Sequence, residues 1–203
     1  MTLTETSDDD RLRREASLLS PNDICAEVLA LSVVEYTYTP SLTISVELGQ
    51  TGGQLHDSGR GIMLTPDPGD TMSHAQRSHT CIYPCFSANP EVDAILQELV
   101  WGKRGALGPA LAVAACPSYQ FVSEREGQKW TQTFQYGVPL GPPKLLGPTP
   151  ARGTTITFDT GGQIDRAAFA QLADTLCSRI PGLVIAVRAS AETHNIPQGR
   201  SPL

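Results

Sequence analysis

The pattern of apolar and polar positions along the chain predicts helices and strands in separate groups. Residues 20–36 carry an apolar stripe at helical spacing, and the Ser20–Pro21 start is typical of a helix N-terminus. The same spacing predicts further helices at residues 91–101, 109–116 and 165–180. Two-residue alternation or a short apolar run predicts strands at residues 43–48, 54–57, 119–123, 129–136, 154–159 and 183–188.

Antiparallel strands grouped apart from helices favour an α+β fold, a two-layer sandwich with the helices on one face of the sheet. We expect one domain at residues 20–189. Residues 1–19 are polar and charged, which predicts disorder or a frayed helical turn, and residues 190–203 are expected to form a disordered tail. Residues 64–90 and 141–152 lack periodicity and are expected to be loops.

Composition and charge narrow the classes of function. The chain has 203 residues and a net charge of −6, so it lacks the basic surface that binds a nucleic-acid backbone, and no direct DNA binding is expected. The longest apolar run, residues 106–116, falls short of the roughly 18 residues that cross a membrane. The N-terminus shows no secretory signal, and a cytoplasmic location is therefore expected.

Three stretches carry candidate chemistry. Glu27 and Glu35 lie on the opening helix, where a carboxylate could deprotonate a water molecule. In residues 56–62, an acid at a strand end precedes a Gly-x-Gly turn, an arrangement that lets a carboxylate accept from the amine of a base. Residues 102–109 form a Gly-rich loop that enters a helix and could offer N–H groups to phosphates. Taken singly, each is more typical of an ordinary turn, a helix start or a solvated helix face.

The order and spacing of these stretches resemble a known family. The segments HDSGRGI at residues 56–62, EREGQKWTQTFQYGVP at 124–139 and GTTITF at 153–158 are similar to motifs of the ATPase domain of bacterial gyrase B and of topoisomerase IV, within the GHKL nucleotide-binding superfamily. The resemblance extends over about residues 24–188. It implies the Bergerat fold, with a mixed, mostly antiparallel sheet and helices on one face, and ATP as the ligand.

The resemblance also implies roles for individual residues. Asp57 matches the adenine-binding aspartate of the family, and Thr154 matches the threonine that supports a water at the adenine site. Gly61 and Ile62 match residues that line the adenine pocket. The Gly-rich loop is expected to bind the phosphates of ATP through Gly102, Lys103, Gly105 and Gly108.

The opening helix supplies the expected catalytic acid. Glu27 matches the catalytic glutamate of the family when one residue is inserted between it and the following hairpin. The same placement brings Glu35 to the position of a second family glutamate, which pairs with the arginine of the DGRG segment, here Arg60. We therefore expect Glu27 to be the general base of any active site, and Glu35 and Arg60 to form a structural pair.

Several residues depart from the family pattern in ways that bear on hydrolysis. Leu31, one helical turn after Glu27, stands where the family has its Mg²⁺-binding asparagine, and leucine cannot coordinate a hard cation. Pro109 lacks the N–H that a phosphate-binding amide would supply. Gly105 and Ala106 replace a family histidine and a family glycine. ATP remains the expected ligand, but Mg²⁺ binding is in doubt and hydrolysis is expected to be weak or absent.

Two functions from different classes follow. The first is a divergent, truncated, stand-alone ATP-binding domain like that of gyrase B; if active, it would be an ATP-hydrolysing domain related to type II DNA topoisomerases. The alternative is a pseudo-ATPase that serves as a non-catalytic interaction module and docks on a gyrase-like or other protein partner. Leu31 and Pro109 favour the alternative.

A third, weaker possibility lies in the irregular loop, which has no counterpart in the resemblance. His74, His79, Cys81 and Cys85 fall within twelve residues of one another. Imidazole and thiolate groups are the ligands that zinc prefers, which would suit a zinc-dependent regulator. The spacing matches no common zinc motif, so a polar loop without metal is the competing interpretation.

Overall fold

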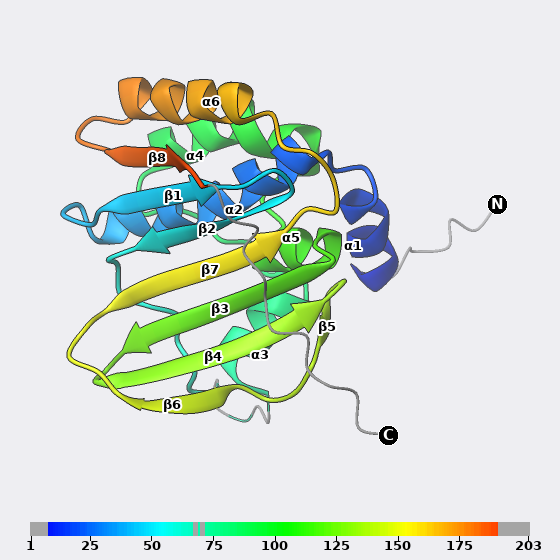
Figure 1. The fold of residues 1–203 in the computed structure, drawn as a ribbon, viewed down its shortest axis with the longest axis vertical. Coiled ribbons are helices and arrows are strands. Elements are labelled where there is room, and N and C mark those ends of the chain that lie inside the picture. Colours follow the sequence, from blue (N-terminus) through cyan, green and yellow to red (C-terminus); the bar gives the residue numbers. More distant parts are fainter. Residues whose placement is uncertain (1–7, 67–68, 70–71, 191–203) are drawn as a thin grey trace.

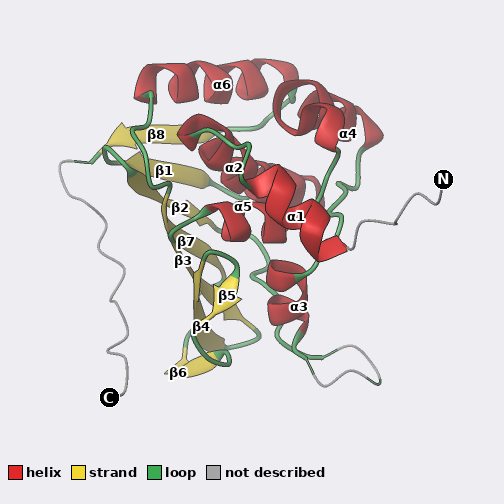
Figure 2. Cartoon of the chain, turned by 90° about the vertical axis from the view of Figure 1, so that its right-hand side faces the viewer, coloured by secondary structure: helices red, strands yellow, loops and turns green. Residues whose placement is uncertain are grey.

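A computed structural model of the chain describes residues 8–66, 69 and 72–190. Figure 1 shows a single twisted sheet, and Figure 2 shows that the helices cover one of its faces. The architecture is α+β in two layers with a mixed, mostly antiparallel sheet, which confirms the predicted fold class.

The helices surround one long central helix. The elements are α1 (Asp8–Ala16), α2 (Pro21–Tyr38), α3 (His74–Thr80), α4 (Pro90–Leu96), a π-turn η1 (Gln97–Trp101), a 3₁₀ turn η2 (Gly102–Arg104), α5 (Pro109–Ala115) and α6 (Arg166–Arg179). The strands are β1 (Ile44–Leu48), β2 (Gly52–Asp57), β3 (Ser118–Arg125), β4 (Gln128–Gln135), β5 (Val138–Pro139), β6 (Lys144–Pro148), β7 (Gly153–Asp159) and β8 (Ile185–Ala189).

The strand order brings the functional segments together. The sheet runs β5-β4-β3-β7-β2-β1-β8, with β6 paired to β4. Of the pairs within this sheet, β1 and β8 are parallel, and the others are antiparallel. In the β2–β7 pair, Asp57 lies opposite Thr154 although the two are far apart in sequence. The sheet therefore places two predicted adenine-site residues side by side.

Helix α2 is the centre of the helical layer. It starts in a capping box, in which the Ser20 side chain accepts from the Asp23 N–H and the Asp23 carboxylate accepts from the Ser20 N–H. Residues such as Val28, Leu29 and Val33 are fully buried, because α2 lies between the sheet and the outer helices (Figure 2). This burial fixes the orientation of α2, and therefore which of its side chains face the candidate functional site.

Three segments differ from the predictions. Residues 8–16 were expected to be disordered or frayed, but they form α1, because Leu12 and Ala16 bury their side chains against α5. The long loop contains α3, and the expected connecting loop at residues 141–152 contains β6. The rest of the predicted N-terminal tail, residues 1–7, and the predicted tail at residues 191–203 lie outside the described residues.

Among the helices that the structure describes, none has both the length and the apolar character needed to span a membrane.

Candidate functional site

Asp57 ends strand β2 as a buried carboxylate, 3% exposed. Its Oδ1 accepts from the Gly59 N–H at 3.0 Å, and its Oδ2 accepts from the Ser32 hydroxyl of α2 at 2.8 Å. Burial raises the pKa of Asp57 above its ordinary value, while these hydrogen bonds oppose the rise. Since a carboxylate oxygen has two lone pairs, each oxygen retains capacity for a further donor.

Asp57 lines a cavity of about 500 Å³ between α2 and the sheet on one side and the α3 region on the other. Gly61, Ile62 and Thr154 line the same cavity, so the structure brings the four predicted adenine-site residues together. The apolar part of the wall comes from α2 and β7, at Leu31, Val34 and Ile156, and the far wall includes residues 83–86.

The predicted pair of Glu35 and Arg60 is present at the edge of this cavity. The Arg60 Nη2 and Nε lie 2.8 Å and 2.9 Å from the two carboxylate oxygens, and the Arg60 N–H also donates to Glu35 at 2.8 Å. The guanidinium stacks 4.3 Å over the ring of Tyr38. Burial opposes ionisation of Glu35, but the hydrogen bonds and charge of Arg60 hold its pKa below the ordinary value. This pair fixes the turn after β2 against α2.

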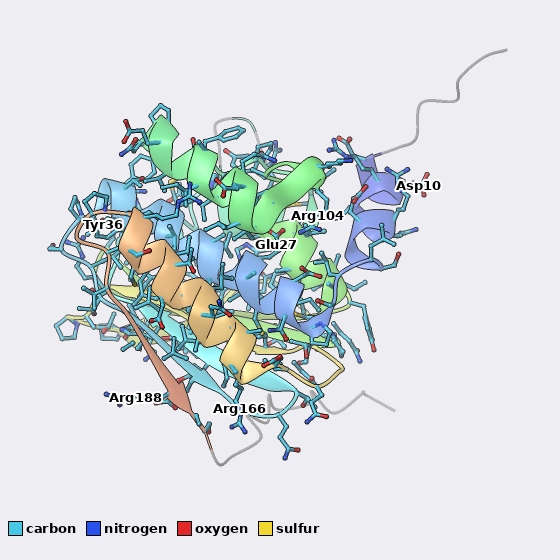
Figure 3. All side chains as sticks on the ribbon, turned by 90° about the horizontal axis from the view of Figure 1, so that it is seen from above. Asp10, Glu27, Tyr36, Arg104, Arg166 and Arg188 are labelled. Atoms are coloured by element: carbon cyan, nitrogen blue, oxygen red, sulfur yellow. The ribbon has the colours of Figure 1, made fainter. Side chains whose placement is uncertain are left out.

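Glu27 lies two helical turns before Glu35, in a different environment. It is 4% exposed, and its Oε1 accepts from the Arg104 Nη2 at 3.1 Å, a contact seen from above in Figure 3. Burial raises its pKa from 4.5 to about 7, although Arg104 opposes the rise. Of the described residues, those that line the cavity include Leu31 but not Glu27. The predicted general base is therefore separated from the cavity by one helical turn and engaged with Arg104.

The glycines of the Gly-rich loop do not line the cavity. Gly102, Gly105 and Gly108 adopt positive φ angles of 53°, 73° and 80°, which explains the choice of glycine. Among the described residues, Pro109 lines the cavity, whereas Gly102, Lys103, Gly105 and Gly108 do not. Phosphate binding by these four residues remains a prediction to which the geometry gives no support.

Sequence reasoning missed two parts of the site. Ser32 is the polar residue in an otherwise apolar stretch of α2, and that isolation was a signal for a buried hydrogen bond. Residues 83–86 carry no periodicity that could have placed them against the cavity.

The described residues hold no group of three or more His, Cys, Asp or Glu side chains that could bind a metal ion, so the structure gives the zinc hypothesis no support. His79 is instead a core residue, 2% exposed, with its ring stacked on Phe134 and its Nδ1 2.7 Å from the Ala75 carbonyl oxygen. Burial lowers its pKa to about 4. Cys81 is exposed, while His79 points into the core, so His74, His79, Cys81 and Cys85 do not converge.

Comparison with protein-family models gives no match, and neither does comparison with curated protein sequences. The structure is similar to the crystal structure of the 43K ATPase domain of Thermus thermophilus gyrase B in complex with an aminocoumarin, with a TM-score of 0.65 and 18% sequence identity. The match covers 82% of this chain and 42% of that chain, so the chain spans less than half the length of its structural relative. At this identity the similarity shows the fold: the chain has the fold of the part of the gyrase B ATPase domain that it matches.

Proposed function

We propose that the chain is a GHKL-like domain that binds the adenine group of a ligand at Asp57 and hydrolyses ATP weakly or not at all. The observation that carries the proposal is a buried carboxylate that lines a cavity and retains lone pairs for a donor from a ligand. Desolvating a carboxylate is costly unless donors surround it, so an amine in the cavity would lower that cost.

The cavity suits a flat, mostly apolar ring. Its volume of about 500 Å³ falls within the range of small-molecule sites. Leu31, Val34, Ile62 and Ile156 supply apolar surface, and Asp57 supplies the acceptor that would fix the orientation of the base. The exocyclic amine of adenine is a donor of the required kind.

The cavity suits ATP hydrolysis less well than it suits adenine binding. Leu31 offers no oxygen ligand to Mg²⁺ at the cavity wall. Glu27, the expected base, is held by Arg104. A general base must reach the proton that it removes, directly or through one water molecule. These observations favour the non-catalytic alternative, in which the domain acts through its ligand or through a protein partner.

The experiment that tests the proposal is a calorimetric titration of the chain with adenosine. Asp57→Asn should weaken binding by about 1–3 kcal/mol, because a charge-assisted acceptor is lost. The variant should fold, since asparagine can accept from Gly59 and donate to Ser32 in the same positions. Asp174→Asn, on the exposed side of α6, is the matched control. Equal affinity in both variants would reject the proposed site.

A further inference from the structure

Residues 83–86 form the wall of the cavity that faces the start of α5. The Tyr83 N–H donates to the Leu107 carbonyl oxygen at 3.2 Å, and a Cβ at Gly108 would collide with the Tyr83 carbonyl oxygen. The other end of the segment is tied to α2 by a hydrogen bond to the Phe86 carbonyl oxygen at 3.1 Å. The segment therefore lies between the cavity and residues 107–108 of the Gly-rich loop.

The region beyond this wall is also occupied by protein groups. Arg104 Nη2 contacts the Glu27 carboxylate and donates to the Val100 carbonyl oxygen at 3.0 Å. Arg11 of α1 donates to the Arg104 carbonyl oxygen at 3.2 Å, which holds the loop from outside. At the first position of α5, Pro109 has no N–H to offer. A phosphate chain would meet the Arg104–Glu27 ion pair there, and the buried Arg104 Nε is the side-chain donor of this pair that has no hydrogen-bond partner.

The charges that line the cavity do not favour a polyanion. Arg60 is paired with Glu35, and Arg125 donates to the Gly61 carbonyl oxygen at 3.1 Å and pairs with Glu126 at 3.0 Å. Asp57 adds a further carboxylate. Among the described lining residues, Arg60 and Arg125 are the only arginine or lysine side chains. A triphosphate carries several negative charges and would find no surplus of positive charge to offset its desolvation.

We infer that the ligand of this cavity is an adenine nucleoside without a triphosphate; this inference rests on the adenine site proposed above. The base is recognised at Asp57, the sugar lies toward residues 83–86, and the wall that these residues form excludes the phosphate chain. The fold is thus that of a nucleotide-binding ATPase domain, but the cavity selects the uncharged part of the nucleotide.

The test is a calorimetric comparison of adenosine, AMP and ATP on the full chain, with and without MgCl₂. Adenosine should bind at least tenfold more tightly than ATP, and MgCl₂ should leave the affinity for ATP unchanged. ATP binding within tenfold of adenosine, or a rise in ATP affinity with MgCl₂, would overturn the inference and leave adenine recognition intact. Failure of all three ligands to bind would overturn both proposals.

A second set of titrations tests whether the preference for adenosine over ATP arises at this cavity. Asp57→Asn should reduce the affinity for adenosine, whereas Asp174→Asn should leave it unchanged. Guanosine, which lacks the amine at the position where adenine carries it, should bind more weakly than adenosine to the unmodified chain. A nucleoside preference that survives Asp57→Asn in full would place the binding elsewhere and overturn the inference.

Discussion

The buried Glu27 makes the stability of the fold depend on pH in a direction opposite to that of an ordinary ion-paired carboxylate. Its pKa is raised from 4.5 to about 7 in the folded chain, mainly by burial. A group with a raised folded pKa contributes stability that is fully present below its unfolded pKa and lost as pH rises through the folded value. Since each pKa unit is worth about 1.4 kcal/mol, ionising Glu27 should cost about 3 kcal/mol of unfolding free energy between pH 4.5 and pH 8.

The perturbation that isolates this effect is Glu27→Gln, which mimics the protonated side chain. Urea unfolding of both proteins from pH 4.5 to pH 8 gives the difference in unfolding free energy at each pH. Glutamine still offers Arg104 an acceptor, so the two proteins should be similar at pH 4.5. At pH 8 the variant should be more stable by about 3 kcal/mol. Two curves that stay parallel across this range would refute the reasoning.

Removing Arg104, the ion-pair partner of Glu27, should destabilise the fold. Arg104 favours the charged form of Glu27, so Arg104→Ala should raise the pKa of Glu27 further and destabilise the fold most above pH 7. Breaking a buried pair from one side typically costs about 3–5 kcal/mol. Arg179→Ala, which breaks an exposed pair with Glu98, is the control and should change the free energy of unfolding little at any pH.

Two further predictions concern other charged and titratable groups. Arg60→Ala should cost about 1 kcal/mol in thermal or urea unfolding, well below the cost of breaking a fully buried pair, because the Arg60 side chain is 46% exposed; a loss above about 3 kcal/mol would contradict this. The pKa of His79 is lowered from 6.5 to about 4, so its contribution is present above pH 6.5 and lost as pH falls through about 4. The unmodified chain should therefore lose about 3 kcal/mol of unfolding free energy between pH 7 and pH 4 that His79→Phe does not lose. An equal loss in both proteins, measured by urea unfolding, would contradict a buried, neutral His79.

Sequence reasoning located most strands of the sheet, though not β5 and β6, because the signals for a strand are local. Alternation in residues 119–123 and 129–136 predicted β3 and β4, and the structure extends or shifts each by one or two residues. The helix start at Ser20 was readable because a capping box needs only residues close in sequence. The resemblance assigned Asp57 and Thr154 to one site, but their pairing across β2 and β7 was not predicted, since no local pattern specifies which strands are neighbours.

The parts that could not be predicted depend on contacts between distant residues. Arg104 reaches Glu27 across 77 positions, and nothing in the local sequence of α2 indicates that its acid is covered. Helix α1 has few apolar residues, and it is ordered because Leu12 and Ala16 pack against α5. Residues 83–86 lack any pattern, and their place against the cavity is set by hydrogen bonds to the Gly-rich loop and to α2.

The most direct test of the central claim is a crystal structure of the chain grown with adenosine. The account predicts the base in the cavity between α2 and the sheet, with its exocyclic amine within about 3 Å of an Asp57 carboxylate oxygen and the Arg104–Glu27 contact intact. Adenosine bound at another surface, or bound in the cavity with its amine turned away from Asp57, would contradict it.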